Sequence, residues 1–375
     1  MTIHWCGTGL SSIPGLRRLI EAGHDVSVWN RSVDKAENAV GDITKQINAF
    51  SFGAVQAQLK AGDVLVSMLP GDWHAKLAEL CIEKGANFVS SSYISPEMRA
   101  LNVAAVDAGV ALVNEVGLDP GIDHLMAHWL VADYRASDAY DADNHISFTS
   151  YCGGVPKQPN PFRYKFSWSP LGVLKALKSP SKSIRDYAPL DVARPWDAIS
   201  SYSAPLPTPE TFEVYPNRDS IPFMADYKFD PAWRVKDFVR GTLRLNGWSD
   251  AWADVFGEVE TANDARLKEM SDGFWANNAY GEDDPDRVIM CVMLKAAAAG
   301  KAVYHKTYVM DAFGDARGTA MARLVSIPVS LAVEAVLERE IPAGVSAAPS
   351  SAKLLDRWLA EVDRLAQHLQ VVGHL

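Results

Sequence analysis

The sequence is 375 residues long and has a formal net charge of −10 at pH 7, with 48% hydrophobic and 22% charged residues. A chain of this length is too long for one compact core, so the composition predicts an ordered globular protein of two or three domains. Binding to nucleic acid or to an anionic membrane surface requires an excess of Lys and Arg, so the negative charge argues against both partners. An anionic substrate is still compatible with the charge if a few arginines are gathered locally.

No basic segment followed by an apolar one precedes the first predicted strand, and no apolar run approaches the roughly 20 residues that span a bilayer. We therefore expect a cytoplasmic protein without a membrane segment. No metal site or disulfide framework is expected either, because the four cysteines never form a CxxC pair and the HLMAH helix lacks the Glu of a metalloprotease. The residues concerned are Cys6, Cys81, Cys152, Cys291, His124 and His128.

The fold class predicted for the first part of the chain is α/β, with a Rossmann-type, doubly wound parallel sheet over residues 1–120. β-rich runs alternate there with amphipathic stretches, which is typical of βαβ units. The expected strands are Thr2–Cys6, Asp25–Trp29, Asp63–Leu69, Asn87–Ser91 and Val110–Glu115.

Residues 121–340 are predicted to form an α+β substrate and dimerisation domain. Short alternating runs between Asp138 and Trp248 indicate an antiparallel or mixed sheet. Residues 247–277 are expected to form a small helical subdomain that contains some of the chain's core tryptophans, among them Trp248. Residues from about 341 to 375 are expected to return to the nucleotide-binding domain. The later elements are predicted as helices at Asp286–Ala299, Ala320–Glu340 and Ala352–Gln370, and a strand at Ala302–Ala312.

The segment Gly7-Thr8-Gly9-Leu10-Ser11-Ser12 follows the first predicted strand and precedes a helix, like the phosphate-binding loop of dinucleotide-binding folds. Gly7 permits the tight turn, Gly9 lets the backbone approach the pyrophosphate, and the helix N-terminus supplies N–H groups. Ser12 stands in place of a third glycine. A pair of glycines that only form a turn is the alternative, which the surrounding strand and helix disfavour.

The end of the second predicted strand reads Trp29-Asn30-Arg31-Ser32, with no carboxylate where an Asp or Glu would bind an adenosine ribose. Arg31, with help from Asn30 and Ser32, can neutralise and stack on a 2′-phosphate, which favours NADP over NAD. A solvated surface arginine is the alternative interpretation.

The stretch Val113–His124 ends the nucleotide-binding part. Its β-branched run stops at a glycine, and a helix is predicted to follow with Asp119 as N-cap and Pro120 at the first helical position. A strand that leads into a capped helix leaves free N–H groups at the open end of a parallel sheet, where α/β proteins bind ligands, so Asp119 is expected in a functional site. Ser90-Ser91-Ser92-Tyr93 offers further hydroxyls at the end of another strand, although such a run is also a normal loop entry.

Two segments of the second domain combine glycines, aromatic rings and hydroxyls, namely Ser150–Pro156 (SYCGGVP) and Tyr164–Leu174 (YKFSWSPLGVL). Adjacent glycines let the backbone approach a ligand, and a loop of Phe, Trp and Ser can line a pocket. Arg218 and Arg244 are candidate clamps for an acidic substrate, because a guanidinium binds a carboxylate through two parallel hydrogen bonds. A surface or structural arginine is the alternative at each position.

Taken together, these segments resemble the saccharopine dehydrogenase family, and specifically its glutamate-forming reductases. The four blocks in the second domain are absent from generic Rossmann dehydrogenases. The matching blocks are Val89–Pro96, Asn114–His124, Ser150–Pro156, Tyr164–Leu174, Tyr215–Ser220 and Arg240–Arg244.

The resemblance implies an enzyme that interconverts saccharopine with glutamate and 2-aminoadipate 6-semialdehyde, using NADP or, alternatively, NAD. Matched position by position, it implies cofactor contacts at Thr8, Gly9, Leu10, Ser11, Asn30, Arg31, Ser32, Met68, Ser90, Ser91, Leu118 and Pro120, beside Gly7 of the loop. It implies substrate contacts at Ser92, Tyr93, Asp119, Ser167, Ser169, Arg218, Thr242, Leu243 and Arg244.

The expected acid–base residues are Asp119, Tyr93 and Cys152, with Asp119 first because its carboxylate can titrate usefully when partly desolvated beside a substrate amine. Cys152 as a small buried residue is the alternative. Two other functions stay open at this point: a related imine-reducing enzyme such as carboxynorspermidine synthase, and a non-catalytic NADP-binding protein. A homodimer is the expected assembly.

Overall fold

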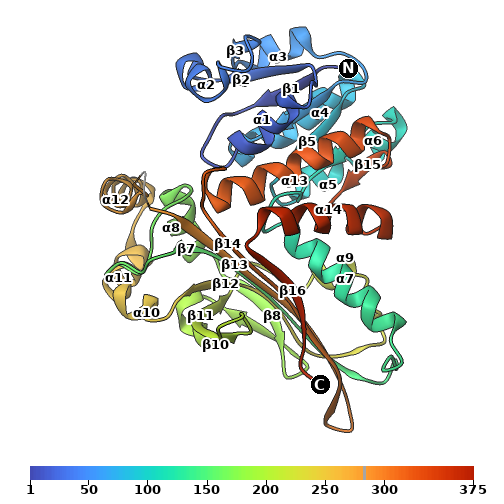
Figure 1. The fold of residues 1–375 in the computed structure, drawn as a ribbon, viewed down its shortest axis with the longest axis vertical. Coiled ribbons are helices and arrows are strands. Elements are labelled where there is room, and N and C mark those ends of the chain that lie inside the picture. Colours follow the sequence, from blue (N-terminus) through green and yellow to red (C-terminus); the bar gives the residue numbers. More distant parts are fainter. Residues whose placement is uncertain (282–283) are drawn as a thin grey trace. The chain divides into compact units, whose positions relative to one another are not determined.

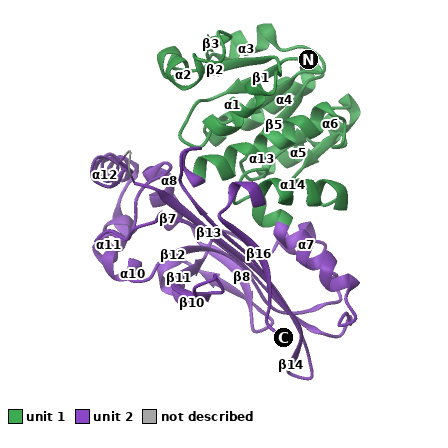
Figure 2. Cartoon of the chain, in the orientation of Figure 1, with its two compact units in different colours: residues 1–125, 321–362 green, residues 126–320, 363–375 purple. Residues whose placement is uncertain are grey.

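A computed structural model of the chain describes residues 1–281 and 284–375. The chain divides into two compact units, residues 1–125 with 321–362 and residues 126–320 with 363–375 (Figure 2). The first unit contains a seven-stranded sheet and the second a nine-stranded sheet (Figure 1). The predicted fold class is therefore confirmed, with a parallel α/β unit and a mixed α+β unit.

All strand pairs in the first unit are parallel, in the order β15-β6-β5-β4-β1-β2-β3. The chain runs from β1 outward to β3 and then crosses back to β4, which makes the space between β1 and β4 the topological switch point. Every residue of β1 and of β4 is buried, as expected for strands covered on both faces. The strands are β1 Ile3–Cys6, β2 Val26–Asn30, β3 Ile47–Ala49, β4 Val64–Ser67, β5 Asn87–Ser90, β6 Ala111–Val113 and β15 Gly344–Ser346.

Amphipathic helices connect these strands, and their apolar sides contribute to the core around Trp29, Leu77 and Phe88. The helices of this unit are α1 Ile13–Glu21, α2 Val33–Val40, α3 Phe52–Gln58, η1 Gly71–Trp73, α4 His74–Lys84, α5 Pro96–Ala100, α6 Asn102–Ala108, α13 Ala320–Leu337 and α14 Ala352–Leu365. β3 and β15, which the sequence did not predict, are only three residues long.

Helix α13 packs against the first helix through Gly15, and the two helices lie side by side in Figure 1. A Cβ on Gly15 would stand 1.9 Å from the carbonyl oxygen of Ser326. The Gly15 N–H belongs to the first turn of α1, where no intrahelical acceptor exists, and it donates to Ser326 Oγ at 2.8 Å. The glycine therefore allows a backbone contact that holds a distant part of the chain on the nucleotide-binding unit.

By length and composition, α13 could cross a membrane, since its 18 residues have a mean hydropathy of 1.7. However, 78% of that segment is buried inside the structure, as in the core helix of a globular unit.

The sheet of the second unit is mixed, because β12 pairs with β7 in parallel while the other pairs are antiparallel. Its main order is β10-β11-β12-β7-β13-β14-β16, and β8 and β9 lie off that path. The strands are β7 His145–Pro156, β8 Ser181–Arg185, β9 Ala188–Val192, β10 Ser200–Ala204, β11 Glu210–Pro216, β12 Arg234–Leu245, β13 Asp286–Ala298, β14 Lys301–Phe313 and β16 His368–Gly373.

The predicted helical subdomain is confirmed as three successive helices, α10 Trp248–Ala251, α11 Ala253–Thr261 and α12 Asp264–Asn278. Together with α8 they bury an aromatic cluster that includes Trp248 and Trp252. The other helices of this unit are α7 Ile122–Ala136, which begins in the first unit, α8 Pro170–Leu177, η2 Pro195–Ala198 and α9 Phe223–Asp226.

Three sequence predictions for the C-terminal third were wrong. Asp286–Ala299 is not a helix but the strand β13, which pairs with β7 and β14. Its segment Val288–Val292 is buried without interruption, and so lacks the alternation that marks an ordinary strand. The helix predicted over Ala352–Gln370 ends at Leu365, and β16 follows it and pairs with β14. The division of the chain shifts accordingly, because α13 belongs to the first unit and residues 363–375 belong to the second.

Replacing Gly15 with alanine should destabilise the first unit, because its Cβ would collide with the backbone of α13. Overpacking of this kind costs about 1–3 kcal/mol, and we expect the midpoint of thermal unfolding to fall by at least about 3 °C. Gly53→Ala is the matched control, since no atom lies within 4 Å of its added Cβ and alanine favours helix α3. An unchanged midpoint for Gly15→Ala would contradict the close packing of these helices.

Candidate functional site

The glycine loop lies at the switch point of the parallel sheet. Gly7 follows β1 with a φ of 106°, and a Cβ there would stand 2.8 Å from the carbonyl oxygen of Met68, which follows β4. Gly7 N–H donates to Trp29 O at 2.8 Å, and Met68 N–H donates to Cys6 O at the same distance. Only glycine fits this turn, so the loop passes directly over the carboxyl ends of β1 and β4.

The side chains of Ser12 and Trp5 anchor the glycine loop, while the tip of the loop is exposed. Ser12 Oγ donates to Gly7 O at 2.7 Å and accepts from Trp5 Nε1 at 2.8 Å, so the residue in the third-glycine position anchors the turn. Gly9 and Leu10 are exposed, and Ser11 is half-buried. Thr8 Oγ1 is buried and has no hydrogen-bond partner in the described part of the chain. An unpartnered hydroxyl beside exposed backbone N–H groups at a helix start fits the pyrophosphate of a dinucleotide.

The residues after β2 complete the nucleotide part of the site. Asn30 Oδ1 accepts a hydrogen bond from Thr8 N–H at 3.2 Å, and Asn30 Nδ2 donates to Ser32 O at 2.8 Å. Asn30 thus ties the glycine loop to the β2–α2 turn. Arg31 is exposed in that turn, and within residues 1–281 and 284–375 no carboxylate forms an ion pair with it. A free guanidinium at this position suits the 2′-phosphate of NADP.

Hydroxyl and amide groups lie at the carboxyl ends of β5 and β6. Ser90 Oγ, which is fully buried, donates to Asn114 Oδ1 at 3.0 Å, and Asn114 Nδ2 donates to Leu112 O. Ser91 lies against Gly117, where a Cβ would come within 2.9 Å of the Ser91 Cβ. The predicted serine run therefore forms a fixed edge of the site.

The loop that contains Asp119 differs from its prediction. Helix α7 begins at Ile122, so Asp119 is not the N-cap and Pro120 is not the first helical residue. Instead Gly117 N–H donates to Pro120 O at 2.9 Å and Gly121 has a φ of 148°, which closes a tight turn before the helix. Asp119 lies half-buried in this turn, and the Tyr93 hydroxyl donates to its Oδ1 at 2.9 Å. Two of the predicted acid–base residues are therefore in direct contact.

A buried contact between a histidine and a glutamate supports the same loop. His124 Nε2 lies 2.9 Å from Glu115 Oε2, and Glu115 Oε1 accepts a hydrogen bond from Ile94 N–H at 2.8 Å. These contacts connect the segment after β5 with the start of α7. Leu118 and Pro120, the two neighbours of Asp119 in the sequence, are both buried. Among the described residues no group of three His, Cys, Asp or Glu side chains could hold a metal ion.

His74 is a component of this edge that the sequence interpretation missed. It is the first residue of α4, and its ring bridges the ends of β4 and β5 through contacts of 3.0 Å from Nδ1 to Ser67 Oγ and 2.8 Å from Nε2 to Ser92 Oγ. Burial lowers the pKa of His74 to about 4, so the ring is neutral near pH 7. Its place at a helix start just after a strand was the signal available in the sequence.

In the second unit, β12 places Thr242 and Arg244 two residues apart and so on one face of the sheet. Thr242 is paired with Cys152 on β7 and with Tyr215 on β11. Leu243 faces the other way and is fully buried in the apolar cluster on the opposite face, so its side chain cannot reach a ligand on the Arg244 face. Cys152 is buried.

Three aromatic rings surround the Arg244 guanidinium. Its Cζ lies 4.9 Å from the ring centre of Tyr164, 5.7 Å from that of Tyr215 and 5.5 Å from that of Trp248. Arg244 is 6% exposed, Nη1 donates to Leu243 O at 3.2 Å, and Nε has no hydrogen-bond partner in the described part of the chain. The structure describes no carboxylate in ion-pair contact with it. This arrangement offers a desolvated, positioned cation for an anionic ligand.

The remaining predicted substrate residues of the second unit are less enclosed. Ser169 is exposed and caps α8, where its Oγ accepts a hydrogen bond from Gly172 N–H at 3.3 Å, and Ser167 is half-buried before it. Arg218 is exposed in the loop after β11 and has a φ of 58°.

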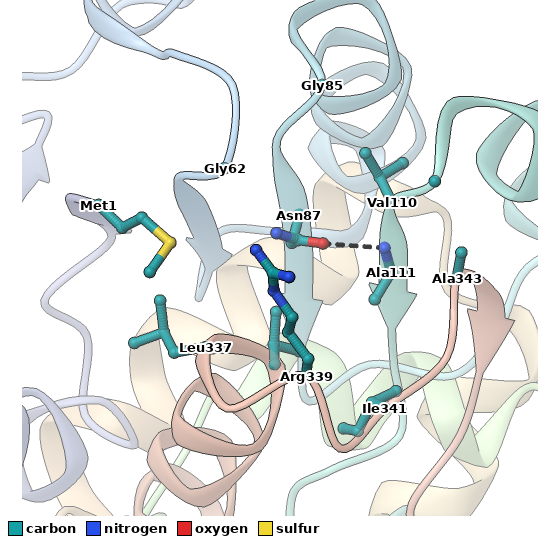
Figure 3. A pocket seen from close by; sticks show the side chains of 12 residues that line it. Met1, Gly62, Gly85, Asn87, Val110, Ala111, Leu337, Arg339, Ile341 and Ala343 are labelled. Carbon is teal, nitrogen blue, oxygen red and sulfur yellow. Dashed lines mark hydrogen bonds between the residues drawn. The ribbon is translucent and has the colours of Figure 1, made fainter.

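A pocket of about 360 Å³ in the first unit lies elsewhere (Figure 3). Its walls include Gly62, Gly85 and Val110, which precede β4, β5 and β6, so it lies at the amino ends of the strands. Arg339 reaches into it beside Asn87 (Figure 3). Ligands of doubly wound sheets bind at the carboxyl ends, so this hollow is not the nucleotide site.

A parallel sheet with a glycine loop at its switch point and an arginine after β2 defines the first unit as an NADP-binding domain of the Rossmann type. Residues 4–113 match the family model described as the saccharopine dehydrogenase NADP binding domain, and residues 117–365 match the saccharopine dehydrogenase C-terminal domain. The chain belongs to the saccharopine dehydrogenase family, as the motifs predicted.

Curated relatives carry the same family name. Saccharopine dehydrogenase (NADP+, L-glutamate-forming) of Pyricularia oryzae is 34% identical over 249 residues, which cover 64% of this chain and 54% of that protein. The protein of the same name from Saccharomyces cerevisiae is 38% identical over 202 residues, which cover 52% of this chain and 43% of that protein. The matches thus span about half the length of these relatives.

Among solved structures, the apo saccharopine dehydrogenase (L-Glu forming) of Saccharomyces cerevisiae has a TM-score of 0.80 at 24% sequence identity, with 100% of both chains covered. The homospermidine synthase of Legionella pneumophila has a TM-score of 0.67 at 11% identity. These two likenesses establish the shared fold.

Arg31→Asp should shift cofactor preference from NADP toward NAD by at least about tenfold, because a carboxylate replaces the cation that pairs with the 2′-phosphate. Dissociation constants for NADPH and NADH, measured by fluorescence titration, would give the ratio directly. Lys301→Asp, an exposed residue of the other unit, makes the same change in net charge and should leave the ratio unchanged. If the wild-type chain binds NADH as tightly as NADPH, the assignment of Arg31 to the 2′-phosphate of NADP is wrong.

Proposed function

We propose that this chain catalyses the reversible, NADP-dependent conversion of saccharopine to L-glutamate and 2-aminoadipate 6-semialdehyde. The observation that carries the proposal is the buried Arg244 guanidinium, which lacks a carboxylate partner in the described residues and is held by three aromatic rings. Saccharopine presents three carboxylates, and a positioned guanidinium selects such groups. The names of the relatives, saccharopine dehydrogenase (NADP+, L-glutamate-forming), support the same substrate.

Substrate binding, proton transfer and cofactor binding are assigned to different residues of the site. Arg244 binds a substrate carboxylate, and Arg218 contributes a second, more exposed guanidinium. Asp119 accepts or returns the proton at the substrate nitrogen, and the Tyr93 hydroxyl, which donates to Asp119 Oδ1, holds that carboxylate in place. The unpartnered Thr8 hydroxyl and the exposed backbone of Gly9, together with Arg31, bind the phosphates of NADP, which would supply hydride acceptance when bound. Cys152, paired in register with Thr242, is assigned a lesser part in proton transfer.

We also propose that the protein acts in the cytoplasm as a homodimer. No disulfide joins any of the four cysteines, all of which lie in the described residues, and this agrees with a reducing compartment. Twofold dimers are the commonest of the closed assemblies that soluble proteins form, which supports the dimer.

The test is a steady-state assay of NADPH formation with saccharopine and, separately, with carboxynorspermidine. We expect turnover of saccharopine. Asp119→Asn should lower kcat for saccharopine by at least about a hundredfold, because the general base is removed, and should retain NADP binding. Turnover of carboxynorspermidine alone would assign the chain to a related imine-reducing enzyme. Binding of NADP with no turnover of either compound would leave a non-catalytic NADP-binding protein.

A further inference from the structure

His74 links two serine hydroxyls at neighbouring strand ends, and each hydroxyl has few other contacts. Ser67 Oγ is buried, and within the described part of the chain its hydrogen-bond contact is His74 Nδ1 at 3.0 Å. Ser92 Oγ is likewise in contact with His74 Nε2 at 2.8 Å. The backbone of Ser92 is fixed separately, because its N–H donates to Ser90 Oγ and its O accepts from Glu115 N–H.

The direction of these hydrogen bonds follows from the need of the buried Ser67 hydroxyl for a hydrogen-bond acceptor. A buried hydroxyl proton needs an acceptor, and Nδ1 is the acceptor that the described residues provide for Ser67. Nδ1 is then the unprotonated nitrogen, so a neutral ring carries its proton on Nε2. That Nε2–H donates to Ser92 Oγ, and the Ser92 hydroxyl proton is left to point away from the ring.

The ring remains neutral because it is desolvated. Burial is the largest cause of the low pKa of His74, and it outweighs the nearby Asp72 carboxylate, which acts in the opposite direction. The T-shaped contact with Phe88, at 6.1 Å between ring centres, fixes the plane of the imidazole. A fixed, neutral ring can orient a hydroxyl but is a poor proton carrier near pH 7.

We propose that His74 is a positioning residue that holds the Ser92 hydroxyl as a hydrogen-bond donor to a carboxylate oxygen of the substrate. The inference rests on the proposed function, since saccharopine supplies the carboxylate. It assigns to Ser67 a role as well: this hydroxyl selects the tautomer of His74, and so determines that Ser92 donates and does not accept.

A double-mutant cycle on His74 and Ser92 tests this chain of contacts. Ser92→Ala should raise the KM for saccharopine about tenfold, since a hydrogen bond to a charged group is lost, and should leave the KM for NADP unchanged. His74→Leu should raise the KM for saccharopine by a similar factor. The double variant His74→Leu/Ser92→Ala should have a KM for saccharopine no higher than that of either single variant, because His74 acts through Ser92. His74→Gln, which keeps an N–H near Ser92, should restore part of the affinity. Thermal unfolding of each variant separates these effects from misfolding.

The tautomer itself is measured without any turnover. Imidazole ¹⁵N chemical shifts of the unliganded protein, with His74 assigned by its loss in His74→Leu, should show the proton on Nε2, and Ser67→Ala should reduce that preference. A proton on Nδ1 of His74 would overturn the inference. Additive effects of His74→Leu and Ser92→Ala on the KM for saccharopine, in an active enzyme, would overturn it as well. Absence of saccharopine turnover in the wild type, with the Nε2 tautomer present, would instead refute the proposed function and remove the ligand assigned to Ser92.

Discussion

The buried guanidinium of Arg244 is the constraint around which the second unit is organised. A charge out of contact with water is destabilising unless an opposite charge or well-placed dipoles and rings compensate. Here the rings of Tyr164, Tyr215 and Trp248 and one backbone carbonyl supply part of that compensation. Burial also raises the pKa of the Tyr215 phenol, which therefore stays neutral beside the cation. The remaining compensation is what an anionic substrate would bring.

The same constraint explains the architecture that supports Arg244. β12 lies between β11 and β7, so its register is fixed on both sides, and a shift of one residue would turn Arg244 into the apolar cluster that Leu243 occupies. Trp248 follows at the start of the helical subdomain and belongs to both the ring cage and the core of that subdomain. The subdomain therefore stabilises the cation as well as covering the sheet.

The nucleotide-binding unit could be predicted well from local patterns, because short buried strands, glycine turns and amphipathic helices each leave a signal within a few residues. Features that depend on distant contacts could not. The segment Val288–Val292 of β13 is buried without interruption, so it could not be told from a buried helix. The turn around Asp119 places Gly117 against Ser91, a contact that no local pattern reveals. His74 and Ser92 were separated by eighteen positions, and only the sheet order brings them together. The ring cage was foreseen only in parts, with Trp248 assigned to the core alone.

The central claim, that Arg244 awaits a substrate carboxylate, is tested most directly by calorimetric titration of saccharopine into the protein saturated with NADPH, where no turnover can occur. Arg244→Leu should weaken saccharopine binding by at least about thirtyfold, because a charge-assisted pair is lost. Arg234→Leu is the matched control at the exposed start of the same strand and should leave the dissociation constant unchanged. Equal dissociation constants for the wild type and a fully folded Arg244→Leu variant would contradict the account.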